Sequence, residues 1–150
     1  MAFNIVLIEP EIPMNTGNIG RLSLASGCNL HLVKPFGFEL DDTRLKRAGL
    51  DYWKHINLFI YDSIKELYEK NPGANMVYFS SHAEHNHWNL DYQKNQFLIF
   101  GKESIGLAPS LVEKNKNKTY KIPLFSTQVR SLNLANAVSI VVYEGLRQLG

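Results

Sequence analysis

A chain of 150 residues, 45% hydrophobic and 20% charged, suits one hydrophobic core and is too short for two independent ones, so we expect a single domain over residues 1–150. A net charge of +2 excludes tight nucleic-acid binding by the overall field, so such a partner needs a local basic patch or two pooled subunits. One cysteine excludes an internal disulfide, and the N-terminal segment lacks signal-peptide features and any membrane-spanning run. We expect a cytoplasmic protein.

Six apolar runs predict strands, and most of them are apolar at every position rather than at alternate positions. Strands of that kind are covered on both faces, which is typical of a parallel sheet between layers of helices. The sequence therefore predicts an α/β fold with a mostly parallel sheet flanked by helices. The predicted strands span residues 4–9, 30–34, 57–61, 75–80, 96–101 and, with a weaker pattern, 119–123.

Four further segments carry helix signals. They span residues 18–26 before Gly27, 41–49 with Asp41 or Asp42 as N-cap, 62–70 before an Asn-Pro-Gly turn, and about 131–150. The first turns of the last helix are apolar on nearly every side, so it must lie in the core or against another subunit. We favour both, because a small domain has little room to bury a helix completely; a purely intramolecular core helix is the alternative.

The stretch EIPMNTGNIGR (11–21) follows the first strand, where α/β proteins often place a nucleotide-binding turn. Its glycines are Gly17 and Gly20, and Asn15 stands where a G-x-G-x-x-G fingerprint has its first glycine. The stretch FGKES (100–104) lacks the upstream glycine of a P-loop. These departures exclude both phosphate loops, and we interpret 11–21 as a backbone-rich turn that comes close to a bound substrate.

The sequence gives little support for a metal site or a reactive thiol. His82, His85 and His87 have loose metal-like spacing without a matching cysteine or carboxylate cluster, so we predict a polar loop and no metal site. Cys28 lies beside Gly27 at the end of a predicted helix, where the helix dipole raises a thiol pKa, so we expect it to be unreactive.

Three irregular segments each follow an apolar run: PEIPMNTGNIGR, FGKESIGLAP and IPLFSTQVRSLNLANA. Ligands bind at the carboxyl ends of strands in an open α/β sheet, so we expect all three segments to meet at one site. In order and spacing they resemble the three signature motifs of the SPOUT superfamily of RNA methyltransferases. Together with DDTRLKRAGLDY (41–52), the likeness covers essentially the whole chain.

The resemblance implies an α/β-knot fold with a C-terminal trefoil knot, a homodimer formed through the C-terminal helix, and S-adenosyl-L-methionine (AdoMet) as cofactor, with S-adenosyl-L-homocysteine as product. Carried over by motif, the residues expected to bind the cofactor are Phe79, Gly101, Ile122, Ser131, Leu132 and Asn133. A glycine at position 101 fits this role, because a missing Cβ lets the backbone approach a ligand closely.

The same carry-over implies three catalytic candidates. Arg21 corresponds to the superfamily's catalytic arginine; guanidinium is always charged, so we interpret it as a phosphate clamp or alkoxide stabiliser rather than a general base. Tyr143 matches a tyrosine that could position or accept the proton, although a hydrogen-bonded core residue is the alternative. Glu103 is a candidate for ordering Arg21 or the nucleotide.

Basic and aromatic residues mix over 43–55, a composition suited to phosphate contact and base stacking by Tyr52 and Trp53, although a solvated helix face is the alternative. The predicted RNA-binding residues are Asn15, Asn18, Arg44, Lys46, Arg47 and Arg130. The closest likeness implies 2'-O-methylation of the wobble nucleotide, C34 or a modified U34, in the anticodon stem-loop of tRNA. Another tRNA or rRNA site, or a catalytically silent RNA-binding dimer, are the alternatives.

Overall fold

The strands in the described part of the chain belong to one parallel sheet. The structure is a computed structural model that describes residues 2–150, with the backbone alone at 46 and 49–51. Within these residues the sheet has seven strands in the order β3-β2-β1-β6-β4-β7-β5, and every strand pairing is parallel, as predicted. The strands are β1 (Phe3–Ile8), β2 (Asn29–Val33), β3 (Leu58–Tyr61), β4 (Met76–Phe79), β5 (His85–Asn86), β6 (Gln96–Phe100) and β7 (Thr119–Lys121).

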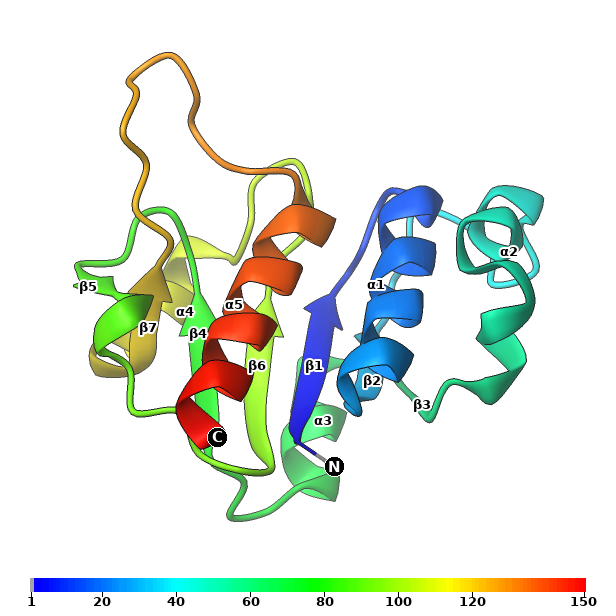
Figure 1. Ribbon diagram of the computed structural model, residues 1–150, viewed down its shortest axis with the longest axis horizontal. Coiled ribbons are helices and arrows are strands. Elements are labelled where there is room, and N and C mark those ends of the chain that lie inside the picture. The colour runs from blue at the N-terminus through cyan, green and yellow to red at the C-terminus, as the bar shows by residue number, and fades with distance from the viewer. Residues whose placement is uncertain (1) are drawn as a thin grey trace.

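Helices cover both faces of this sheet (Figure 1), which confirms the predicted α/β class. α1 and α5 lie on one face, and α3 and α4 on the other. The helices are α1 (Pro13–Ser26), α2 (Thr43–Gly49), α3 (Ile64–Lys70), α4 (Pro109–Lys114) and α5 (Leu134–Leu149), with 3-10 turns η1 (Leu50–His55), η2 (His87–Asn89) and η3 (Lys116–Lys118). Among the described residues, no helix has the length and apolar character needed to cross a membrane.

Strand β1 lies inside the sheet, between β2 and β6, and is buried along its whole length. Because successive side chains of a strand point to opposite faces, Phe3, Ile5 and Leu7 pack with α1 and α5, while Val6 and Ile8 pack against the layer of α3 and α4. This double burial explains why the strand runs are apolar at every position. The parallel strands also bring their carboxyl ends to one edge of the sheet.

The interpretation of 11–21 as a turn is wrong, because helix α1 begins at Pro13, five positions before the predicted start. Proline suits the first turn of a helix, because the backbone N–H that it lacks would have no hydrogen-bond partner within the helix there. Gly20 lies inside the helix, where two neighbouring side chains leave no room for a Cβ. A Cβ there would lie 2.6 Å from Ile56 and 2.9 Å from Trp53. Gly20 in this stretch therefore serves the close packing of a helix against its neighbours.

Helix α5 begins at Leu134, with Asn133 as its N-cap, rather than near Ser131. Val138, Val141 and Val142 are buried against the sheet, which confirms the predicted core packing. The opposite side of the helix remains exposed, and it carries the apolar residue Ile140. Strand β5 and helix α4, which the sequence patterns did not predict, are only 2 and 6 residues long.

A buried histidine makes the stability of the fold depend on pH. His31 on β2 is 3% exposed, and its ring lies 2.9 Å from both the Tyr61 hydroxyl and the Asn4 side-chain oxygen. Burial lowers the pKa of His31 from 6.5 to about 4. The unfolded chain therefore takes up this proton first, so stability is fully present above about pH 6.5 and is lost as the pH falls toward 4.

We predict that the free energy of unfolding falls by about 2 kcal/mol through His31 between about pH 7.5 and pH 5. Urea unfolding at the two pH values measures it. The variant His31→Gln should lose that much less stability over the same interval, whereas the exposed control His82→Gln should behave as wild type. An identical pH dependence in wild type and His31→Gln would refute the assignment.

Candidate functional site

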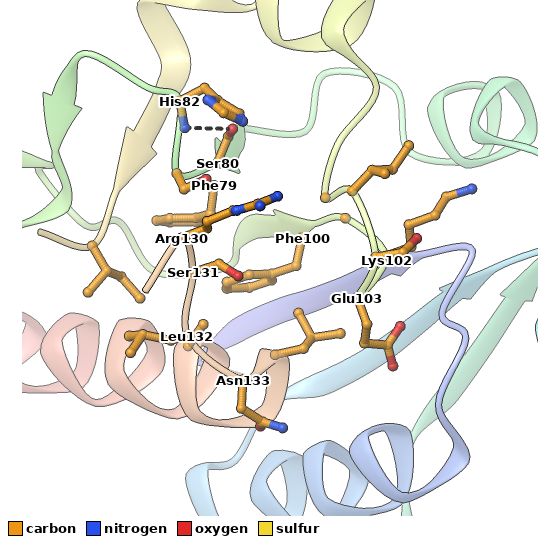
Figure 2. A pocket seen from close by; sticks show the side chains of 18 of the residues that line it. Phe79, Ser80, His82, Phe100, Lys102, Glu103, Arg130, Ser131, Leu132 and Asn133 are labelled. Carbon is orange, nitrogen blue, oxygen red and sulfur yellow. Dashed lines mark hydrogen bonds between the residues drawn. The ribbon is translucent and has the colours of Figure 1, made fainter. Parts of the chain in front are cut away.

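A pocket of about 680 Å³ opens at the carboxyl edge of the sheet (Figure 2). Its walls come from the start of α1, from the loop after β4, from the loop after β6, and from the segment between β7 and α5. The three segments that the sequence predicted to meet at one site therefore do meet. The lining includes Ile12, Asn15, Phe79, Ser80, His82, Phe100, Gly101, Lys102, Glu103, Tyr120, Ile122, Leu124, Arg130, Ser131, Leu132 and Asn133.

The structure brings together all six residues predicted to bind the cofactor, since Phe79, Gly101, Ile122, Ser131, Leu132 and Asn133 all line this pocket. The rings of Phe79 and Phe100 stack beside it, with centroids 4.9 Å apart and planes 13° from parallel. An apolar surface with a few polar groups is typical of small-molecule sites. Cofactor binding by these residues stays a prediction.

Gly101 makes the tight loop after β6 possible. A Cβ at this position would lie 2.1 Å from the carbonyl carbon of Gly106 and 2.2 Å from the Leu107 nitrogen. Both neighbours are backbone atoms that cannot rotate away. The loop closes with a hydrogen bond of 2.8 Å from Gly106 N–H to the Lys102 carbonyl, and Gly106 has a φ of +72°, which other residues rarely adopt. Only glycine at 101 lets the loop fold back on itself this closely.

One buried amide connects the three segments. The Asn15 side chain is 6% exposed and donates from Nδ2 to Glu103 Oε2 at 3.2 Å. Its Oδ1 accepts a hydrogen bond of 3.1 Å from Nδ2 of Asn133, whose own Oδ1 accepts from the N–H of Asn136 and caps α5. The amide groups of Asn15 thus join α1 to the loop after β6 and to α5; its predicted contact with RNA stays a prediction.

Carboxylates hold the loop after β6 against the start of α1. Glu103 accepts hydrogen bonds of 2.8 Å from the N–H groups of both Glu11 and Ile12, which precede the helix. In return, the Glu11 carboxylate accepts a 2.8 Å hydrogen bond from the N–H of Ser104, and this bond lowers the pKa of Glu11. Within its own chain, the hydrogen bonds of Glu103 go to α1 and the residues before it and not to Arg21; its role in ordering Arg21 or the nucleotide stays a prediction.

Two of the three catalytic candidates lie outside the pocket of their own chain. Arg21 is exposed on α1, with its guanidinium carbon 5.2 Å from the centroid of the Tyr52 ring. Tyr143 is exposed on α5, which packs beside α1. Neither residue lines the pocket to which Glu103 contributes. The catalytic role of each stays a prediction.

The predicted RNA-binding residues lie in three places. Asn18 is exposed on α1, and Arg44 and Arg47 are exposed on α2. Arg44 pairs with Asp42 at 3.0 Å, which raises the pKa of the guanidinium. Arg130 lines the pocket itself. The side chain of Lys46 lies outside the described part of the chain.

Trp53 is half-buried and packs against the hydrophobic core, while Tyr52 beside it is exposed; base stacking by either ring stays a prediction. Cys28 is buried, and burial raises the pKa of its thiol, in agreement with the expected lack of reactivity. Among the described side chains, no group of three or more metal-ligating residues is found.

Sequence reasoning missed several residues of the lining. Ser80 and His82, which follow strand β4, were not among the residues predicted for the site. The rule that ligands bind at the carboxyl ends of strands would have included these positions, since each stands at a strand end. Asn15 and Glu103 were identified, but their partnership depends on contacts between positions 88 residues apart.

We predict that Glu103→Gln lowers the free energy of unfolding by about 2 kcal/mol, because the substitution removes the charge and places an NH₂ donor against N–H donors. Urea unfolding of this variant, beside the control Glu113→Gln on the exposed side of α4, measures the effect. Equal stability of the two variants would contradict a structural role for the carboxylate.

The family of the chain follows from comparisons with known proteins. The model of the SpoU rRNA methylase family matches residues 2–143. A relative from Listeria monocytogenes serotype 4b, provisionally named tRNA (cytidine(34)-2'-O)-methyltransferase, is 46% identical over 151 residues, which cover 99% of this chain and 89% of the relative. The tRNA (cytidine(34)-2'-O)-methyltransferase of Yersinia pestis is 42% identical over 153 residues, with coverage of 98% and 94%.

A solved structure from work on the 2-OH methylation of C/U34 on tRNA superposes with a TM-score of 0.94. It is 43% identical in sequence, and the match covers 98% of this chain and 95% of that chain. The architecture is accordingly the α/β-knot fold with its C-terminal trefoil knot that the SPOUT resemblance implied. Since the family model spans nearly the whole sequence, the chain belongs to the SpoU rRNA methylase family.

Proposed function

We propose that the protein transfers a methyl group from AdoMet to the ribose 2'-hydroxyl of the wobble nucleotide of tRNA, C34 or a modified U34. The observation that carries the proposal is the single pocket built from all three signature segments. Full-length relatives that carry the name of this activity support the choice of substrate. Because tRNA is a cytoplasmic substrate, the protein would act in the cytoplasm.

The pocket suits AdoMet in size and chemistry. Its volume of about 680 Å³ lies within the range of small-molecule sites, roughly 300–1,000 Å³. Phe79, Phe100 and Ile122 offer apolar surface to an adenosine, and the glycine at 101 lets the loop after β6 fold back tightly to form one wall. Ser131 and Asn133 would provide polar groups at the start of α5.

When bound, AdoMet supplies a methyl group on a positively charged sulfur. The protein must then hold the ribose 2'-hydroxyl in line with that group and assist the loss of its proton. The Arg21 guanidinium would bind the neighbouring phosphate or stabilise the alkoxide that develops, as a fixed positive charge does. The Tyr143 hydroxyl would hold the 2'-hydroxyl in place by a hydrogen bond or, as its phenolate, accept the proton.

A second copy of the chain would complete the site. Arg21 and Tyr143 lie on adjacent helices yet outside the pocket of their own chain, so they can serve the pocket of a partner. Ile140 and Tyr143 are three residues apart on the exposed side of α5, and Met14 at the start of α1 is also exposed. Exposed apolar side chains in this position favour a homodimer through α5, with the tRNA anticodon stem-loop bound by both subunits.

We expect Ile140→Asp to convert the dimer to a monomer and to abolish methyl transfer, because the charge prevents burial of the helix face. Multi-angle light scattering measures the mass, and radiolabel transfer from AdoMet measures the activity. Ile60→Asp on the edge strand β3 is the matched control, since Ile60 is 36% exposed and Ile140 40%. A dimer that persists with Ile140→Asp argues against this interface.

Arg21→Ala should lower kcat by about 10²–10³-fold, the usual effect of losing one donor to a developing oxyanion, and leave AdoMet affinity unchanged. Single-turnover assays give the rate, and nucleoside mass spectrometry of the digested tRNA locates the methyl group. Arg21→Lys should recover little, because a point charge cannot replace a bidentate donor. Full activity in Arg21→Lys, or a methyl group at another nucleotide or only in rRNA, would refute the proposal.

A further inference from the structure

Arg21 is held by an aromatic ring. Its guanidinium carbon lies 5.2 Å from the centroid of the Tyr52 ring, within the range of about 6 Å for a cation–π contact. The Tyr52 ring is 42% exposed, so it retains one surface toward solvent while it contacts Arg21. The resemblance to SPOUT enzymes assigned Tyr52 no role at Arg21. The contact joins α1 to η1, two elements between which β2 and α2 lie in the sequence.

The position of Tyr52 follows from packing at the residue before Arg21. Gly20 brings the α1 backbone within contact of Trp53, which packs against the core and fixes η1 on the helix. Tyr52 precedes Trp53 in the chain and is exposed where Trp53 is half-buried. Two neighbouring contacts thus join α1 to η1. Gly20 packs against Trp53 and docks the two elements, and Arg21 contacts Tyr52, which holds the guanidinium.

An ion pair with a carboxylate compensates the charge of a guanidinium and occupies its N–H donors, whereas contact with a ring does not compensate the charge. Arg44 donates from Nε and Nη2 to Asp42 at 3.2 and 3.0 Å, so its charge is compensated and part of its donor edge is occupied. No carboxylate of the described side chains pairs with the Arg21 guanidinium, so after contact with the Tyr52 ring it keeps N–H groups available for bidentate hydrogen bonds. Tyr52 therefore restricts Arg21 without using up its donors.

We propose that Tyr52 is a positioning residue for Arg21, which it holds ready to bind a phosphodiester oxygen of the RNA substrate through the free edge of the guanidinium. The proposal rests on the proposed function for the identity of the substrate. Restricting a long side chain before binding reduces the entropy lost when the complex forms. The ring supplies this restriction, and the Tyr52 hydroxyl is not required for it.

Kinetics of two variants separate the ring from the hydroxyl. Tyr52→Phe keeps the ring and should retain the wild-type single-turnover rate, whereas Tyr52→Leu should lower it by about two- to fivefold, the value of an exposed cation–π contact. AdoMet affinity should be unchanged in both. Trp88→Leu, which removes another exposed aromatic side chain on η2, is the control and should have no effect. Equal losses in Tyr52→Phe and Tyr52→Leu, or no loss in either, overturn the proposal.

A double-mutant cycle tests whether Tyr52 acts through Arg21. In an Arg21→Ala background, Tyr52→Leu should cause no further loss of rate, because the group that it positions is gone. A Tyr52→Leu loss of the same size in both backgrounds would mean that the ring acts independently, for example by stacking on a base, and would overturn the proposal.

An NMR measurement without RNA keeps this test separate from the proposed function. The Arg21 Nε–H resonance, assigned by its absence in Arg21→Lys, should be shifted by the ring current of Tyr52. Tyr52→Phe should keep that shift and Tyr52→Leu should remove it. If the protein methylates no tRNA but the shift behaves this way, the proposed function fails while the pairing stands; a shift unchanged by Tyr52→Leu overturns the pairing itself.

Discussion

The hydrogen bonds of the Asn15 amide join parts of the chain that are 88 and 118 residues away from it. One partner is the carboxylate of Glu103, in the loop after β6, and the other is Asn133, the N-cap of α5. A buried amide left without partners is costly, so each of the three segments restrains the other two. The walls of the pocket depend on this connection because the strands fix only where each segment begins.

Helix α1 has two functions, one at its start and one at its middle. Its first turn contributes Ile12 and Asn15 to the pocket, while its middle carries Gly20 and Arg21. Gly20 lets η1 dock against the helix, and the docked segment places Tyr52 over Arg21. A helix that is anchored at one end to the pocket and along its side to η1 can hold a charged group at a fixed distance from a substrate.

The sequence predicted the class of sheet and the place of the pocket because both follow from local patterns. Fully apolar runs indicate strands buried on both faces, and the carboxyl ends of parallel strands share an edge. The start of α1 was missed because Asn15, Gly17 and Gly20 have turn propensity, and only tertiary contacts with Trp53 and Ile56 explain the glycine at 20. The burial of Asn15 likewise depends on partners that no local pattern connects. Short elements such as β5 carry too few residues for a periodic signal.

The proposed function requires that the pocket joined by Asn15 is the AdoMet site. Calorimetric titration of the purified protein with AdoMet, in parallel with Asn15→Ala, tests this requirement most directly. We predict saturable binding of one AdoMet per chain to the wild-type protein and a clear loss of affinity in Asn15→Ala at a temperature where both proteins are folded. Absence of saturable binding at millimolar AdoMet, or equal affinity in the two proteins, would contradict it.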